Sequence, residues 1–240
     1  MCATFGATAA PAITGAVCFT DVFSANATFG LAAGNYLQLD TTVTSPSLPS
    51  QVTATATYSL DSSIVLPLNF YTGPIFADKN FNRFLTDLSR TSAWNFQVTD
   101  PTGTTTGACN AIAAPELLPL VLNLSVTQDG ATPLIAWDLP DLSAFDVDRI
   151  RFRVIDASNG ASIRQYVLPA SDTSFRIPLG VVSVGGTYEF RVMLDDLAGG
   201  RLENRSNTFS GLVTLVPEPG TLALLGLGLA GLAFTRRRRQ

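Results

Sequence analysis

The chain has 240 residues, of which 46% are hydrophobic and 14% are charged, a composition typical of folded rather than disordered proteins. Its 19 acidic and 15 basic residues give a net charge of −4, and four of the basic residues are the arginines at positions 236–239. The rest of the chain is therefore acidic, which argues against a nucleic acid as partner, because phosphate binding needs a basic surface. The chain has no histidine, so it lacks the commonest general base and the commonest ligand of transition metals.

Three cysteines stand at positions 2, 18 and 109, and their spacing matches no zinc or redox motif. In an oxidising compartment they allow one disulfide, and both Cys18–Cys109 and Cys2–Cys18 remain open. We expect a structural role for these thiols, because no histidine is present to activate a nucleophile. Residues 1–11 lack the basic and apolar regions of an export signal, so we expect that a signal peptide is missing from this chain.

Residues 1–110 are expected to form a β-rich domain with one short helix. Apolar residues alternate with threonine and serine from Val52 to Leu60, and with polar residues from Trp94 to Val98, which is the pattern of half-buried strands. Between these strands, four apolar residues follow the candidate N-cap Asp78 at helical spacing, and they are Phe81, Phe84, Leu85 and Leu88. Residues 111–119 are rich in Ala and Pro and are predicted to be a linker.

Several aromatic residues gather between positions 70 and 81 in a stretch that also contains Pro and Gly. Packing in a core is the interpretation we favour, and a surface on which sugars stack is the alternative. A carbohydrate-binding or adhesion module with its ligand site in residues 1–110 would need an exposed row of the side chains of Tyr71, Phe76 and Trp94. Burial of all three would argue against this alternative.

Residues 120–215 show the period-two alternation of strands with turn signals at the spacing of a β-sandwich. Seven strands are predicted, and they lie at 120–126, 134–137, 150–154, 163–168, 175–177, 188–194 and 206–215. The segment is similar to fibronectin type III and related immunoglobulin-like domains. Trp137 stands where that family has its core tryptophan, and Tyr188, in the run Gly185 to Val192, matches its tyrosine corner. The resemblance implies a spacer or adhesive module, and the fold alone sets no function.

Arginines alternate with apolar residues along the strand 149–154, and Arg164, Arg176 and Arg191 extend the pattern. The hypotheses are a solvated face paired with acids at 146, 148, 156 and 189, which we favour, and a site for an acidic polysaccharide. Acids at 138, 141, 146 and 148 suggest either a solvated loop, again favoured, or a loose calcium site. No motif indicates catalysis, so we predict that the protein is not an enzyme and needs no cofactor.

The last 25 residues, 216–240, have three parts in a fixed order. Pro217, Glu218 and Pro219 come first, and prolines cannot continue a preceding strand or helix. The uncharged run Thr221 to Phe234 follows, and as a helix it would be about 21 Å long, short for a bilayer core of roughly 30 Å. Arg236, Arg237, Arg238 and Arg239 then form a basic block that would stay on the cytoplasmic side of a membrane.

This order resembles the PEP-CTERM sorting signal of bacterial surface proteins. The resemblance implies a short transmembrane helix in the tail and processing of the tail by an exosortase, an integral-membrane enzyme. It also implies export, passage through the inner membrane, and delivery to the cell surface or the extracellular matrix. We therefore predict an all-β body with a C-terminal sorting signal, in a non-catalytic surface or matrix protein associated with exopolysaccharide.

Overall fold

The computed structural model describes residues 9–28, 30, 32–71, 79–128 and 132–216 of the chain. Within these ranges the regular structure consists of β-strands and one 3-10 turn at Pro49–Gln51. The strands form three sheets, so the all-β class predicted from the alternating pattern is confirmed.

The largest sheet has eight strands, and we call it the long sheet. Its order is β12 (Ala161–Pro169), β11 (Arg149–Asp156), β14 (Thr187–Ala198), β15 (Arg201–Thr214), β1 (Ala12–Phe23), β2 (Gly34–Thr44), β6 (Lys79–Leu85) and β5 (Asn69–Tyr71). A four-stranded sheet contains β4 (Val65–Pro67), β3 (Thr53–Tyr58), β7 (Trp94–Asp100) and β8 (Gly103–Cys109). A three-stranded sheet contains β13 (Ser174–Arg176), β10 (Leu134–Asp138) and β9 (Leu122–Thr127).

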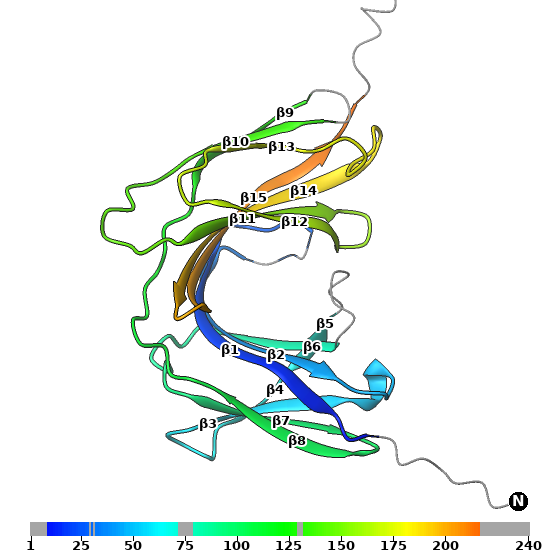
Figure 1. The fold of residues 1–240 in the computed structure, drawn as a ribbon, viewed down its shortest axis with the longest axis vertical. Helices are drawn as coiled ribbons and strands as arrows, with labels where there is room; N and C mark the ends of the chain where they lie inside the picture. Colours follow the sequence, from blue (N-terminus) through cyan, green and yellow to red (C-terminus); the bar gives the residue numbers. More distant parts are fainter. Residues whose placement is uncertain (1–8, 29, 31, 72–78, 129–131, 217–240) are drawn as a thin grey trace, which may run out of the picture.

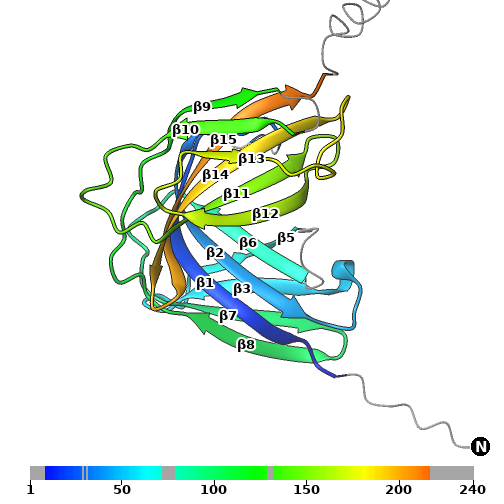
Figure 2. The ribbon, with the colours of Figure 1, turned by 45° about the horizontal axis from the view of Figure 1, so that its top comes forward.

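The long sheet curves strongly, and each of its halves is covered by one of the smaller sheets on the outside of the curve (Figure 1). The four-stranded sheet lies against the half made by β1, β2, β6 and β5. The three-stranded sheet lies against the half made by β12, β11, β14 and β15, as a second view also shows (Figure 2). Two sandwiches therefore share one continuous sheet.

Each sandwich has its own apolar core, because alternate residues of each strand point between its two sheets. The first core is built around Leu37, Leu39, Phe81, Trp94 and Phe96, all of which are fully buried. The second core is built around Ile135, Trp137, Phe152, Phe190 and Leu194. A smaller aromatic cluster contains Phe23, Phe209 and Ile155, with Tyr36 and Phe84 packed against it, so it joins residues of both halves.

Strand β1 pairs with β15 in parallel, and this pairing makes the long sheet continuous. The register places Thr20 opposite Asn204 and Phe23 opposite Asn207. On its other side β1 pairs with β2 in the antiparallel sense, over nearly the whole length of both strands. Residues about 180 positions apart in the sequence are thus direct neighbours in one sheet.

The predicted linker, residues 111–119, lies packed along β15 rather than crossing free space. The carboxylate of Glu203 accepts hydrogen bonds from the backbone N–H groups of Ala113 and Ala114. Asn204 accepts one from the backbone N–H of Glu116 at 2.9 Å and donates one to the carbonyl oxygen of Ala114 at 2.9 Å. Leu118 is fully buried in the second core. The Ala/Pro-rich segment is therefore an ordered connection, because side chains of β15 form hydrogen bonds with its backbone N–H and C=O groups.

The helix predicted after Asp78 is wrong, because residues Lys79–Leu85 form strand β6. Phe81 and Leu85 both face the first core, as residues two or four positions apart do in a strand. Phe84 faces the other way and packs edge-on against Phe23, with ring centroids 5.5 Å apart. Both faces of this part of the long sheet are buried, so β6 has apolar residues on both of them. The resulting spacing of apolar residues, three and four positions apart, resembles that of a helix.

The strands predicted between residues 120 and 215 correspond one by one to β9 through β15. Trp137 is buried in the second core and stacks on Phe152, with ring centroids 6.3 Å apart. The hydroxyl of Tyr188 accepts a hydrogen bond from the backbone N–H of Ser183 at 2.8 Å, which is the corner contact expected of it.

Over the ranges that the structure describes, no helix has the length and apolar character needed to cross a membrane. The helix predicted at 221–234 lies outside those ranges.

Candidate functional site

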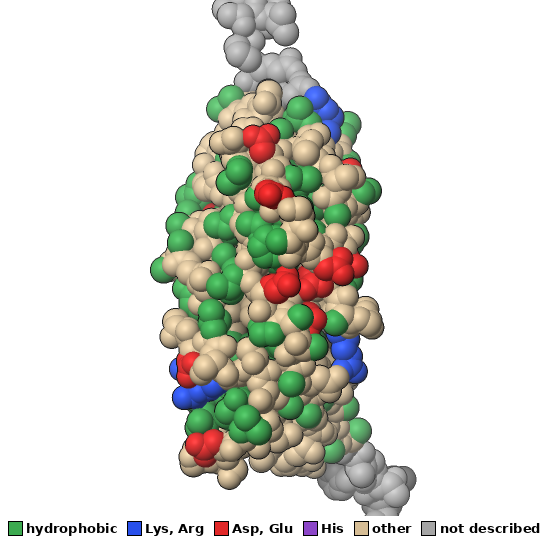
Figure 3. Space-filling view, turned by 90° about the vertical axis from the view of Figure 1, so that its left-hand side faces the viewer, with side chains coloured by type: hydrophobic (Ala, Val, Ile, Leu, Met, Phe, Trp, Pro, Cys, Tyr) green, Lys and Arg blue, Asp and Glu red, His purple; other side chains and the backbone are tan. Residues whose placement is uncertain are grey.

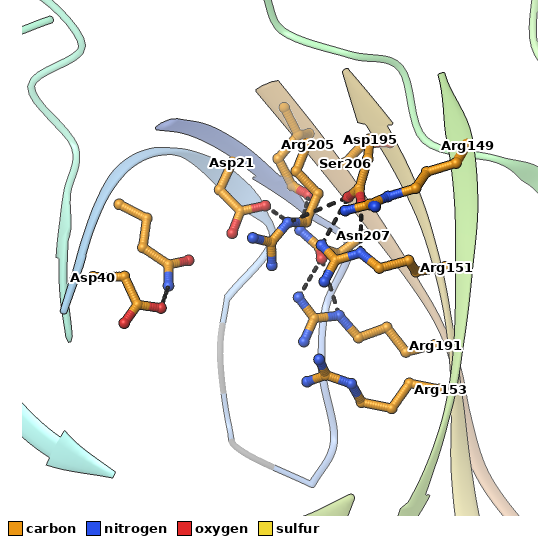
Figure 4. A network of polar contacts seen from close by, with 12 residues as sticks. Asp21, Asp40, Arg149, Arg151, Arg153, Arg191, Asp195, Arg205, Ser206 and Asn207 are labelled. Atoms are coloured by element: carbon orange, nitrogen blue, oxygen red, sulfur yellow. Dashed lines mark hydrogen bonds and ion pairs between the residues drawn. The ribbon is translucent and has the colours of Figure 1, made fainter. Parts of the chain in front are cut away.

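The long sheet buries a second, polar face on the inside of its curve, and we call it the inner face. Along β11, Ile150, Phe152 and Val154 point into the second core, so the alternating arginines of this strand point to the inner face. Strands β14, β15 and β1 continue the pattern. The charged members of the inner face are Asp21, Asp40, Arg149, Arg151, Arg153, Glu189, Arg191, Asp195 and Arg205, most of which are drawn in Figure 4.

Asp195 is the carboxylate around which three of these arginines gather. It is fully buried and accepts hydrogen bonds from Arg149 Nε at 3.0 Å and from Arg151 Nη2 at 2.8 Å. Arg205 Nε lies 3.6 Å from Oδ1 of Asp195, the oxygen that also accepts from Arg151 Nη2. Burial opposes ionisation of this carboxyl, but the hydrogen bonds and charges of Arg151 and the charge of Arg205 outweigh it and hold the pKa of Asp195 below its usual range.

Asp21 lies on β1, across the pairing with β15. Asn207 Nδ2 donates a hydrogen bond to Asp21 Oδ1, whereas Oδ2 has no hydrogen-bond partner in the described part of the chain. Burial raises the pKa of Asp21 to about 6, even though the charges of Arg205 and Arg191 favour its ionised form. Asp21 is therefore a buried acid whose ionised form is poorly compensated.

Arg153 and Arg191 differ from the arginines around Asp195, because they donate their hydrogen bonds to side-chain amides and not to a carboxylate. Arg153 donates two hydrogen bonds to Gln165 Oε1, at 3.2 and 2.6 Å. Arg191 donates from Nε to Asn207 Oδ1 at 2.9 Å, and its guanidinium lies beside the rings of Phe23 and Phe209. Burial together with the charges of Arg151 and Arg205 lowers the pKa of Arg153 to about 10. Burial and the charges of Arg153 and Arg205 lower the pKa of Arg191 as well.

The predicted solvated arginine face is wrong for the arginines of β11 and β14, since they belong to this inner face. Glu189, one of the expected partners, instead accepts hydrogen bonds from Asn26 Nδ2 at 2.9 Å and from the backbone N–H of Ala27 at 3.1 Å. Arg164 is exposed as predicted. The sequence placed the arginines on one side of the strand, but a single strand could not show that this side is also covered.

The structure does not form the aromatic row that a carbohydrate-binding surface in residues 1–110 would need. Trp94 is fully buried and donates a hydrogen bond from Nε1 to the carbonyl oxygen of Arg90 at 3.1 Å. Tyr71 is partly buried and donates its hydroxyl to Asp40 Oδ2 at 3.0 Å. Phe76 lies outside the described residues. Phe81 is buried in the first core, as the favoured interpretation predicted.

The acids between residues 138 and 148 do not converge on one point. Asp138 accepts a hydrogen bond from Asn123 Nδ2 at 2.7 Å, Asp141 accepts one from the backbone N–H of Ser143, and Asp148 accepts one from the backbone N–H of Leu197. Across the described ranges no three acidic or cysteine side chains are placed to hold a metal ion. Acidic side chains gather about midway along the face that residues 111–119 cross (Figure 3).

The three cysteines give one disulfide in the described part of the chain, between Cys18 on β1 and Cys109 at the end of β8. It ties the long sheet to the four-stranded sheet across the first core, and both cysteines are buried. Of the two pairings that the sequence left open, the structure shows Cys18–Cys109.

The sorting residues predicted from the sequence, Pro217 to Pro219 and Arg236 to Arg239, lie outside the described residues. The described chain ends just before them. Leu215 is fully buried, and its backbone N–H donates to the carbonyl oxygen of Gly186 at 3.0 Å. Val216 is exposed, and its N–H donates to Gln128 Oε1 at 3.0 Å. The described chain is therefore hydrogen-bonded to the body up to the residue that precedes the Pro-Glu-Pro motif.

Comparison with known families matches residues 215–239 to the PEP-CTERM protein-sorting motif. The chain thus carries this sorting motif, which implies export, membrane-anchored sorting and processing by an exosortase. Among solved structures, the chain is similar to the FN1–FN3 domains of chicken CNTN1, with 10% identity and a TM-score of 0.32, over 88% of this chain and 67% of that one. No curated protein matches the chain.

Proposed function

We propose that this protein is a non-catalytic component of the bacterial cell surface or extracellular matrix, associated with exopolysaccharide. Its tail delivers the folded body to the membrane, where an exosortase processes it. The observation that carries the proposal is the sorting motif at residues 215–239, which begins where the last strand of the body ends.

The disulfide supports export independently of the tail. Disulfides persist in oxidising compartments and are rare in the bacterial cytoplasm. Cys18–Cys109 closes a loop with a sequence separation of 91 across a buried core, so its formation contributes to the stability of the body.

The architecture supports a structural role. In our proposal residues 1–110 and 120–215 are two β units, and the second is a fibronectin-III-like sandwich. Its three-stranded sheet packed on strands β12, β11, β14 and β15 of the long sheet, the buried Trp137 and the corner contact of Tyr188 support this assignment. The continuous long sheet and the packed segment 111–119 would hold the two units as one body, which suits a spacer or matrix component.

In the tail, we propose that Thr221 to Phe234 forms the short membrane helix and that Arg236 to Arg239 stay at its cytoplasmic end. Its length of about 21 Å is below what a permanent span needs, which supports an anchor that is removed after sorting. Pro217, Glu218 and Pro219 are the proposed recognition motif.

Localisation in the native host tests the proposal. The full chain, a chain that lacks residues 217–240, and the control Arg164→Gln would be followed in the membrane, surface and secreted fractions, with and without the exosortase. We expect the control to be distributed like the full chain, and the full chain to collect unprocessed in the membrane without the exosortase. An unchanged distribution after removal of residues 217–240 would refute the role of the tail. Loss of the protein from the matrix of cells that make no exopolysaccharide tests the association separately.

A further inference from the structure

Arg153 and Arg191 are directly opposite each other in the pairing of β11 with β14. Side chains of directly opposed residues lie on the same face of a sheet, with Cβ atoms roughly 4.5–5.5 Å apart. Two arginines at such positions repel each other, and like charges placed directly opposite are normally destabilising. Figure 4 shows their side chains extending from the sheet beside each other toward the same side.

Neither of these two arginines has a carboxylate partner among the described residues. The three arginines around Asp195 share that one carboxylate, whereas Arg153 and Arg191 bond to the amides of Gln165 and Asn207. A buried guanidinium without a carboxylate in contact is costly, because hydrogen bonds to neutral groups, aromatic rings and more distant charges offset only part of its desolvation. The inner face therefore carries five arginines against Asp21, Asp195, the more distant Asp40 (Figure 4) and Glu189, whose carboxylate is bound by Asn26 and Ala27.

Two further buried atoms of the inner face have no hydrogen-bond partner in the described part of the chain, and they are Arg205 Nε and Asp21 Oδ2. Arg205 is 9% exposed and Asp21 is 0% exposed. In native proteins most buried polar atoms are satisfied, so such atoms mark a place where water or a ligand is held. This observation is independent of the arrangement of Arg153 and Arg191, and it concerns the same face.

We propose that Arg153 and Arg191 form a binding site for the carboxylate group of a small organic acid. The guanidinium group presents a planar set of N–H donors that matches the two oxygens of a carboxylate. One carboxylate between the two arginines would supply the charge that their amide partners do not. A monoanion suits the site better than a phosphate dianion, because Asp40 and Asp21 belong to the same polar region. The site goes beyond the proposed sorting and matrix role and does not depend on it.

The experiment is thermal unfolding of the full chain at constant ionic strength, with chloride replaced stepwise by acetate or by glucuronate. A ligand that binds the folded state raises the unfolding temperature as its concentration exceeds its dissociation constant. We expect a saturable rise for the wild-type chain. Acetate and glucuronate distinguish a simple carboxylate from a sugar acid, and a response to either supports the site. No response to either anion beyond that to chloride would overturn the proposal.

The variants assign the response to the site. Arg153→Gln should need at least about tenfold more anion, because it loses a charge-assisted hydrogen bond. The control Arg164→Gln removes an exposed arginine of the neighbouring strand and should respond like the wild type. Gln165→Glu places a carboxylate beside Arg153 within the chain, so it should fold well and lose most of the response. An unchanged response in both Arg153→Gln and Gln165→Glu would contradict the proposal even if the wild type binds.

Discussion

Asp21 on β1 and Arg205 on β15 are register partners in the parallel pairing that joins the two halves of the long sheet. Both are buried, and each has one side-chain atom without a hydrogen-bond partner in the described part of the chain. The guanidinium of Arg205 lies over the ring of Phe19 at 4.3 Å, so an aromatic face replaces part of its hydration. The junction between the halves is therefore polar and electrostatically coupled, unlike the two apolar cores beside it.

This junction predicts an unusual dependence of stability on pH. The pKa of Asp21 rises from 3.8 to about 6 in the folded protein because of burial, so the folded state binds a proton that the unfolded chain has already lost. The free energy of unfolding should therefore fall as the pH rises from about 4 to about 6, by about 3 kcal/mol at most. Asp40, whose pKa burial also raises, acts in the same direction. Below about pH 4, the lowered pKa of Asp195 and of Asp100 gives the opposite slope.

Urea unfolding at pH 4.5 and at pH 6.5 measures the effect, and Asp21→Asn provides the matched variant. Since Asn207 donates to this side chain, an amide oxygen can accept the same hydrogen bond. The variant should lose most of the pH dependence and should be at least as stable as the wild type at pH 6.5. An equally steep dependence in the variant would show that another group titrates.

The disulfide makes a second prediction. Replacing Cys109 with alanine should lower the free energy of unfolding by about 4 kcal/mol, because the disulfide closes a loop with a sequence separation of 91. Cys2→Ala is the control, and it should leave stability unchanged because Cys18 is already paired with Cys109. Unfolding in denaturant with and without a reductant measures both. A destabilised Cys2→Ala together with a stable Cys109→Ala would point to the Cys2–Cys18 pairing instead.

Tyr188 and Gly186 give a prediction for the corner of the second sandwich. Tyr188→Phe removes the acceptor of the Ser183 N–H hydrogen bond and should cost about 1–2 kcal/mol. A Cβ atom at Gly186 would lie 2.7 Å from Cζ of Tyr188, so Gly186→Ala should cost more, and Tyr188→Phe should not rescue it. Tyr166→Phe is the control, because the hydroxyl of that partly buried tyrosine makes no hydrogen bond within the described chain. Equal losses for Tyr188→Phe and Tyr166→Phe would contradict the corner assignment.

The hydrogen bonds of Asn204 lead to a prediction about the stability of the packing of residues 111–119 on β15. Its fully buried side chain donates to Asp196 Oδ2 at 2.5 Å and to the carbonyl of Ala114, and it accepts from the N–H of Glu116. Asn204→Ala should cost about 3 kcal/mol, since it leaves buried groups without partners. Hydrogen exchange at the Glu116 amide should also accelerate, whereas the exposed Asn95→Ala should change neither quantity. Slow exchange at Glu116 in Asn204→Ala would mean that other contacts hold the segment.

The sequence predicted the second sandwich well, because its strands bury one face in an apolar core and so alternate clearly. Ile150, Phe152 and Val154 show this alternation, and β11 lies where they indicate. The sequence of strand β6 has a helix-like spacing because Phe84 faces the aromatic cluster while Phe81 faces the first core. Where both faces of a strand are buried, the period of two is lost.

The inner face could not have been predicted for a related reason. Arginines beside apolar residues usually indicate solvent, and burial of Arg191 depends on β1 and β15, which pair across nearly the whole length of the sequence. A parallel pairing at this separation leaves no local signal in either strand. The sorting signal in the tail could be predicted from the sequence because its three parts are contiguous, and because an apolar run followed by arginines indicates a segment that enters a membrane and stops there.

The most direct test of the central claim is the intact mass of the protein recovered from its native host cells. If the tail is a sorting signal that an exosortase processes, the mature protein should lack the mass of the residues from about Pro217 onward, including Arg236 to Arg239. Recovery of a chain that keeps all four of these arginines, in the surface or matrix fraction of cells with an active exosortase, would contradict the account.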